Sequence, residues 1–285
     1  MNFAQSSNCK FSIKALRFSV AFLLLILGTR SLLAEDFTNL WIYAETAYSQ
    51  KNWNQTIDYC NKAIALETNN PMVYLARGAA FEQTKQFEKA ETDFNKAIVL
   101  ATNNLPLSYA YLGRGYFYQQ QTNLEKAVDD FSKAIQLNPA FQAAYVNRAF
   151  TYELQRRYDL ALIDCNMATL LNPDDVMANF YKGDAFYGKQ EYAKAIEAYS
   201  KAIEIDTNYC WAYSGRAGAY IAKENYPDAI KDYDKVIQFQ PTNAGAYSCR
   251  GLLKSRIGDF RSGIEDCRKA MELDTNNAVI LMEGG

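Results

Sequence analysis

The side chains best placed to do chemistry together are arginines and aspartates that recur in step along the chain. Five arginines each precede a small residue, and the same five segments each carry an aspartate further on; the pairs are Arg77 with Asp93, Arg114 with Asp130, Arg148 with Asp164, Arg216 with Asp232, and Arg250 with Asp266. Two related segments lack both partners, with Tyr43 and Tyr59 in one and Lys182 and Ala198 in the other. This co-occurrence predicts five structural ion pairs between helices. A row of arginines that binds an anion is the alternative, which the matching carboxylates disfavour.

The residue types of the chain give little support for catalysis or metal binding. The chain has no histidine, which excludes His-based general bases, Ser-His-Asp triads and His-containing metal sites. It also has no P-loop, GxSxG or GxGxxG motif. Acidic neighbours such as Asp129 and Asp130 would point in different directions from a helix. The sequence therefore predicts neither an enzyme nor a bound cofactor or metal.

A 34-residue period indicates which elements carry these side chains. One phase of it holds a small residue, mostly alanine, in seven segments: Thr56, Ala90, Ala127, Ala161, Ala195, Ala229 and Gly263. Within one segment, Tyr74, Gly78 and Phe81 share a helix face. A polar break at 84–86 follows, and Asn138-Pro139 is typical of the stops that end the second half. Each segment predicts an antiparallel helix pair, and such pairs must stack to bury both faces.

These residues resemble the tetratricopeptide-repeat family. Its order of aromatic, small and proline positions is matched in one segment by Tyr145, Ala149, Tyr152, Ala161, Cys165, Ala168 and Pro173. The resemblance implies an all-α fold, a right-handed superhelical solenoid of antiparallel helix pairs that forms a single domain over residues 35–285. We expect repeats at 37–70, 71–104, 108–141, 142–175, 176–209, 210–243 and 244–277, with a short apolar stub at 278–285.

The resemblance also implies a function. In this family four positions of each first helix line a concave surface, called the inner face below. Contacts with a peptide are expected there from Trp41, Tyr48, Leu75, Tyr109, Leu112, Tyr116, Phe150, Met177, Phe180, Tyr187 and Trp211. Exposed aromatic and Met side chains favour apolar anchors of a bound segment. We therefore expect a non-enzymatic scaffold that binds a peptide segment of a protein partner. For each residue, packing against the neighbouring first helix is the alternative.

The charge of the inner face limits the class of ligand that fits it. It carries the carboxylates Glu45, Glu82, Glu153 and Asp184, so a basic or neutral ligand fits better than an acidic one. A subgroup of the family binds chaperone C-termini through a Lys/Asn/Lys/Arg clamp, and that clamp is absent. The chain has a net charge of −2 and becomes more acidic beyond residue 34, which disfavours nucleic acid as a partner.

The two ends of the chain differ from the repeats. Lys10, Lys14 and Arg17 precede a ten-residue run at 18–27 that is apolar except for Ser19. This is the layout of a secretory signal peptide, and the run is too short for a bilayer, which needs about 20 apolar residues. We expect cleavage after Ala34 and a periplasmic or secreted protein; a membrane anchor at residues 18–34 is the alternative. The apolar C-terminal stub suggests an alternative function, a homo-oligomeric assembly factor that self-associates through its repeat ends.

Overall fold

The fold is given by a computed structural model, which describes residues 32–273. Those residues form fourteen α-helices and no strand, so the predicted all-α class is confirmed. None of these helices is long and apolar enough to cross a membrane. The stub at 278–285 and nearly all of the predicted signal segment lie outside the described residues. The first described helix begins at Leu32, ahead of the predicted cleavage position after Ala34, and cleavage stays a prediction.

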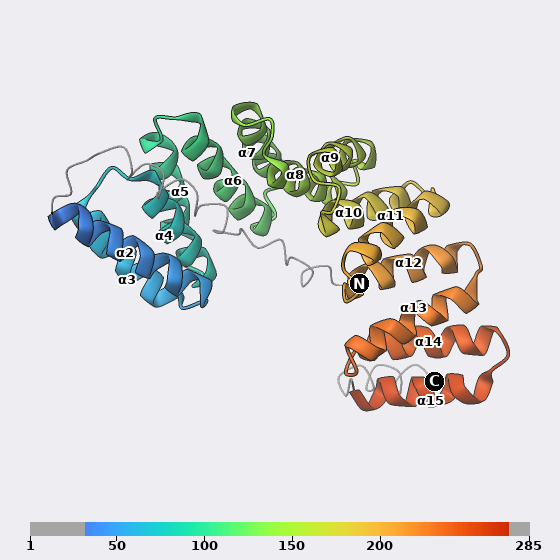
Figure 1. Cartoon of the computed structure of the whole chain (residues 1–285). Helices are drawn as coiled ribbons and strands as arrows, with labels where there is room; N and C mark the ends of the chain where they lie inside the picture. The colour runs from blue at the N-terminus through green and yellow to red at the C-terminus, as the bar shows by residue number, and fades with distance from the viewer. Residues whose placement is uncertain (1–31, 274–285) are drawn as a thin grey trace. The chain divides into compact units, whose positions relative to one another are not determined.

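The helices alternate between the first and the second member of a pair, as Figure 1 shows most plainly for α14 and α15. The first helices are α2 (Leu32–Ser49), α4 (Pro71–Gln83), α6 (Asn104–Gln120), α8 (Gln142–Leu154), α10 (Val176–Gly188), α12 (Cys210–Ala222) and α14 (Ala244–Arg256). The second helices are α3 (Trp53–Leu66), α5 (Phe87–Leu100), α7 (Leu124–Leu137), α9 (Tyr158–Leu171), α11 (Tyr192–Ile205), α13 (Tyr226–Phe239) and α15 (Phe260–Leu273).

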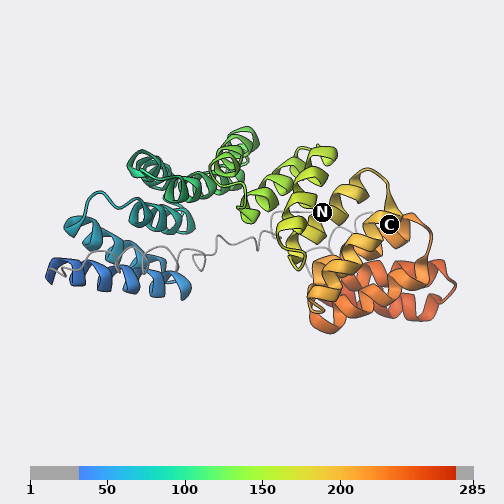
Figure 2. The same cartoon turned by 45° about the horizontal axis from the view of Figure 1, so that its top comes forward.

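The described residues fall into two compact units, called unit 1 and unit 2, with the boundary between Thr151 and Tyr152 inside α8. In unit 1 the first helix α4 contacts α2 and α6 on its two sides. In unit 2 the first helix α10 contacts its own partner α11 and the next first helix α12. Figure 2 shows the paired helices at each end, α2 with α3 and α14 with α15, lying side by side. The single solenoid and its repeat bounds stay predictions.

Each first helix ends in a turn that uses one residue with a positive φ. In the second repeat the residue is Lys85, with φ 60°, and the N–H of the following Gln86 donates to the Phe81 carbonyl at 2.8 Å. The same turn recurs at Lys51, Thr122, Arg156, Gln190, Glu224 and Gly258. Only the last of these is glycine, although a left-handed conformation costs other residues about 1–2 kcal/mol. The tertiary fold therefore stabilises a turn that local sequence disfavours.

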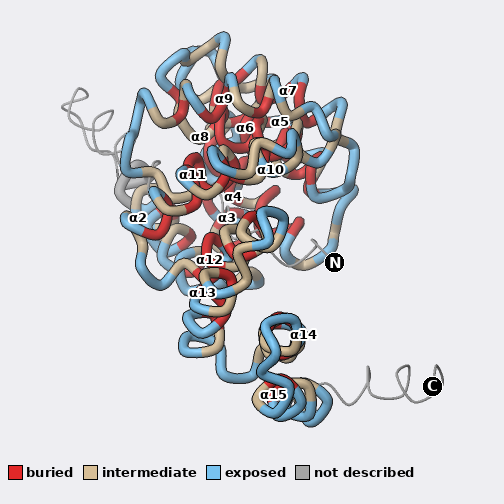
Figure 3. The backbone as a smooth tube through the Cα atoms, turned by 90° about the vertical axis from the view of Figure 1, so that its right-hand side faces the viewer, coloured by how far each residue is buried: buried red, intermediate tan, exposed pale blue. Residues whose placement is uncertain are grey.

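The core is built from rings of second helices set against small residues of first helices. Phe94 and Phe131 are fully buried in unit 1, and so is Tyr199 in unit 2. A Cβ added at Gly183 would stand only 2.5 Å from the ring of Tyr199, so this glycine sets how closely α10 and α11 approach. In Figure 3 the buried segments lie along the sides by which helices pack, and the turns are exposed.

We predict that Gly183→Ala destabilises unit 2 by about 1–3 kcal/mol, because the added methyl group overlaps a ring that cannot move within a packed core. Gly218→Ala is the matched control: its added Cβ meets nothing closer than 3.7 Å, at Tyr187. The higher helix propensity of alanine should then stabilise α12 by up to about 1 kcal/mol. Urea unfolding followed by circular dichroism measures both changes. Equal midpoints for the two variants would contradict this account of the packing.

Candidate functional site

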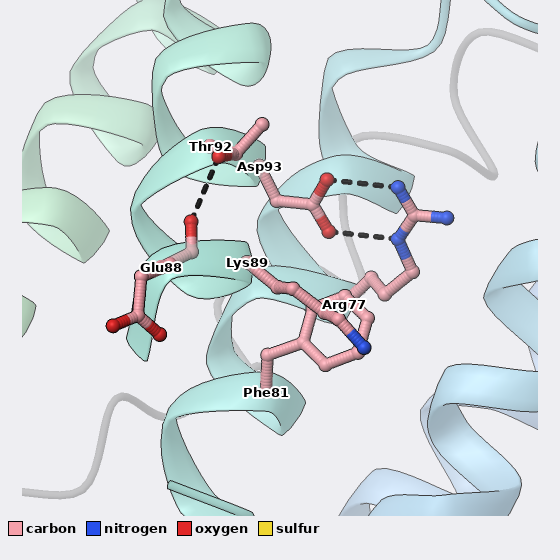
Figure 4. Close-up of a pocket in the computed structure, with 6 residues that line it drawn as sticks. All are labelled: Arg77, Phe81, Glu88, Lys89, Thr92 and Asp93. Carbon is pink, nitrogen blue, oxygen red and sulfur yellow. Dashed lines mark hydrogen bonds and ion pairs between the residues drawn. The ribbon is translucent and has the colours of Figure 1, made fainter. Parts of the chain in front are cut away.

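The structure brings together four of the five predicted arginine–aspartate pairs. In each, Nε and Nη2 of the guanidinium donate to the two oxygens of one carboxylate, as the dashed lines in Figure 4 show for Arg77 and Asp93 at 2.7 and 2.8 Å. Arg114 holds Asp130 in the same way at 2.7 and 2.9 Å. Two pairs in unit 2 repeat the geometry, Arg216 with Asp232 and Arg250 with Asp266. Arg148 and Asp164 belong to different units, and their pairing stays a prediction.

Each arginine also binds a third helix, which the sequence analysis missed. Its Nη1 donates to a polar side chain on the second helix of the preceding pair: Asn61 from Arg77 at 2.7 Å, Asn95 from Arg114 at 2.5 Å, Ser132 from Arg148 at 2.9 Å, Ser200 from Arg216 at 2.8 Å, and Asp234 from Arg250 at 2.6 Å. The available signal was a polar residue recurring at one position of the second helices. One side chain thus joins three helices.

Aromatic rings hold the guanidinium in place. The Arg114 guanidinium lies 5.6 Å from the centre of the Tyr111 ring and 5.7 Å from that of Tyr118, one ring on each side along α6. Arg77 lies in the same way between Tyr74 and Phe81. A guanidinium that is stacked and already bound to a carboxylate has little left for a ligand. These contacts favour the structural interpretation over the anion-binding row.

A shallow hollow beside the first of these pairs is also occupied by its own contacts. It is lined by Arg77, Phe81, Glu88, Lys89, Thr92 and Asp93 (Figure 4). Lys89 lies 5.4 Å from the centre of the Phe81 ring and donates to Gln86. Thr92 donates to the Glu88 carbonyl of its own helix. The hollow therefore offers no cation or hydroxyl that lacks a partner.

The Arg114–Asp130 pair is predicted to be coupled in stability. Removing Asp130 leaves a half-buried guanidinium without its carboxylate, and removing Arg114 leaves a buried carboxylate, so each single alanine variant should lose about 3–5 kcal/mol. The double variant should lose much less than the sum, because neither charge is then left alone. A double-mutant cycle from urea unfolding measures the coupling. Additive losses would refute a paired interaction.

The inner-face candidates differ in how much surface they offer. Five are buried by packing: Trp41, Leu75, Leu112, Phe150 and Phe180. Four are half-buried: Tyr48, Tyr109, Tyr116 and Met177. Two are exposed, Tyr187 on α10 and Trp211 on α12. Surface available for contact is therefore greatest in unit 2, where Leu252 of α14 is exposed as well.

Unit 2 places two inner-face carboxyl groups together. Asp184 accepts a hydrogen bond from the Tyr199 hydroxyl at 2.6 Å. Burial, followed by the charge of Glu153, raises the pKa of Asp184 from 3.8 to about 8, although the Tyr199 bond opposes this. Burial also raises the pKa of Glu153 to about 7. Burial and the charge of Asp184 raise the pKa of the Tyr199 hydroxyl, with smaller contributions from Glu153 and Tyr187. The described residues contain no group of three or more side chains suited to a metal ion.

The raised pKa of Asp184 predicts a stability that falls as pH rises. Between about pH 4 and 8 the folded chain keeps a proton that the unfolded chain has released, so unfolding is favoured by each increase in pH. Asp184→Asn should remove this pH-dependent loss of stability. At about pH 9 the variant should be more stable than the wild type by roughly 2–4 kcal/mol. Urea unfolding at several pH values measures the difference. Asp174→Asn, an exposed carboxylate of the same unit, is the control; parallel pH curves for wild type and Asp184→Asn would rule out the assignment.

Family models and solved structures of known proteins both match this chain. Family models described as "TPR repeat" match residues 183–223 and 218–258, and models described as "Tetratricopeptide repeat" match residues 108–141 and 73–104. No curated protein matches the chain in sequence. Among solved structures, a tetratricopeptide repeat protein from Parabacteroides merdae is 20% identical, with 87% of this chain and 97% of that chain covered and a TM-score of 0.63.

Two further structures show the same fold. The structure of PilF from Pseudomonas aeruginosa is 18% identical, covers 72% of this chain and 92% of its own, and has a TM-score of 0.63. YrrB, described as a TPR protein with an unusual peptide-binding site, is 24% identical, covers 66% of this chain and 95% of its own, and has a TM-score of 0.52. Identities this low bear on the fold alone.

Proposed function

The chain belongs to the tetratricopeptide-repeat family, and from that premise we propose that it is a non-enzymatic scaffold that binds a segment of another protein on the inner face of its first helices. The family fold is generally that of a protein-interaction scaffold without catalysis. The absence of histidine from the chain agrees with such a role. Export, predicted from residues 1–34, is part of the same proposal.

The observation that carries this proposal is the exposure of two large aromatic side chains on successive first helices of unit 2. Tyr187 is 41% exposed and Trp211 is 38% exposed. Trp and Tyr are the side chains that most often anchor protein interfaces. The structurally similar protein YrrB is described as having an unusual peptide-binding site, which supports a peptide segment as the ligand.

We predict that Tyr187→Ala with Trp211→Ala abolishes capture of a partner, because it removes the exposed anchors of the inner face. Chemical crosslinking of the full chain in its native extract, followed by mass spectrometry, measures the capture. The control is Ile163→Ala with Leu170→Ala, two exposed apolar residues on the second helix α9 of the same unit. A partner retained by the control and lost by the inner-face variant supports the proposal. Equal capture by both would contradict the role of Tyr187 and Trp211 as the anchors of the bound segment.

One observation favours the alternative function, self-association through a repeat end. Helix α15 exposes Phe260, Ile264 and Met271, and Figure 3 shows most of this helix as exposed. Their spacing puts them on one side of the helix. If the crosslinked species in the same experiment were second copies of the chain joined at α15, the assembly-factor alternative would replace the scaffold.

A further inference from the structure

Helix α4 carries a carboxylate for which the fold supplies no partner. Glu82 lies at the last inner-face position of α4 and is only 8% exposed. No residue within 32–273 donates a hydrogen bond to its carboxylate or forms an ion pair with it. Burial alone raises its pKa to about 8. Protein interiors seldom leave such a group unmatched, and its oxygens are not among the fully enclosed atoms, so a group from outside can reach it.

Among the described residues, the fully enclosed side-chain atoms without a hydrogen-bond partner lie on first helices of unit 1. The indole Nε1 of Trp41 on α2 and the amide oxygen of Gln119 on α6 are enclosed and unbonded. Gln119 cannot exchange its amide atoms cheaply, since its Nε2 already donates to the Asn147 carbonyl and the Thr151 hydroxyl. Helix α4 contacts both α2 and α6. Glu82 therefore lies on the middle one of three neighbouring first helices, and each of the three carries a polar side-chain group that lacks a hydrogen-bond partner.

The surroundings of Glu82 suit a cation. Tyr48 of α2 lies close enough that the Glu82 charge, after burial, raises the pKa of its hydroxyl. The other titratable inner-face groups of the helices packed on α4 are Glu45 on α2 and Tyr109 and Tyr116 on α6. No inner-face position of α2, α4 or α6 holds Lys or Arg, so the chain does not supply the missing charge. An aromatic ring beside a carboxylate stabilises a bound ammonium or guanidinium group.

We propose that Glu82 binds a Lys or Arg side chain of the protein segment held on the inner face of unit 1. The inference rests on the proposed function and names the chemistry of the segment: it carries a basic side chain beside apolar ones. The basic group donates to the Glu82 carboxylate and lies against Tyr48. An acidic or phosphorylated segment is disfavoured at this position, because it brings a second anionic group to a buried carboxyl group and supplies no cation to pair with it.

The test uses the full chain labelled with ¹³C at its glutamate side chains, followed by NMR. The Glu82 resonance is identified by its loss in Glu82→Gln. The probe is N-acetyl-arginine methylamide, and N-acetyl-citrulline methylamide is its neutral match. Binding of the arginine probe should lower the pKa of Glu82, because a cation favours the charged carboxylate. Glu82→Gln should weaken the probe at least about tenfold, whereas Glu88→Gln, an exposed carboxylate on α5, should not.

The outcomes separate this inference from the proposed function. Equal binding of the arginine and citrulline probes, or an unchanged pKa of Glu82 with the arginine probe present, would overturn the assignment and leave Glu82 as a hydrated or protonated carboxyl group. Neither result affects the requirement for Tyr187 and Trp211 in partner capture. Conversely, partner capture that does not depend on Tyr187 and Trp211 would contradict the anchors named in the proposed function, and the arginine response at Glu82 is measured independently of that result.

Discussion

The arginine that joins three helices is the interaction on which the rest of the structure depends. A single pair of short helices cannot bury both of its faces, so every pair has to be fixed to the one before it. Arg77 does this by holding Asp93 on its own second helix and Asn61 on the preceding one. Because a guanidinium is planar and its donors are fixed in direction, the contacts constrain orientation as well as distance.

That arrangement gives the first helices two unlike sides. Toward the second helices, charges are paired and stacked on rings, as with Arg114 between Tyr111 and Tyr118. On the inner side, Glu82 is buried without a partner and Trp211 is exposed. Both features cost stability: an unmatched carboxylate is poorly solvated, and an exposed indole ring is not removed from water. Natural sequences tend to depart from the rules of packing at sites of function.

The sequence predicts well which arginine pairs with which aspartate. It predicts less well the further contact of each arginine and the conformation of the turns. The arginine–aspartate pairs were predictable because both members vanish together, at Lys182 with Ala198 for example. The contact of each arginine with the preceding second helix was not predictable, because Asn, Ser and Asp share the position that it binds and each of these residues is common on an exposed helix. The left-handed turns were hidden for a similar reason, because only Gly258 among seven such residues has the expected type.

Burial on the inner face was the least predictable property, because it depends on the size of neighbours rather than on the residue itself. Phe180 is covered, with the rings of Tyr181, Tyr199 and Tyr209 all within 6 Å of its own, whereas Tyr187 two turns later is exposed. Both occupy inner-face positions, and no local pattern separates them. The sequence could identify the inner-face positions, but which of their side chains reach the surface follows from three-dimensional packing alone.

The two groups of inner-face carboxyls illustrate how a buried acid becomes a structural group or a candidate binding group. Asp184 has an internal donor in Tyr199, and Glu153 lies near enough to keep one of the two protonated. The Asp184 carboxyl group therefore has its own hydrogen-bond donor within unit 2. Glu82 has no donor of its own, and the nearby Tyr48 is not hydrogen-bonded to it. A carboxyl group on the inner face of a first helix is therefore hydrogen-bonded within the fold at Asp184 and is left open to a cation at Glu82.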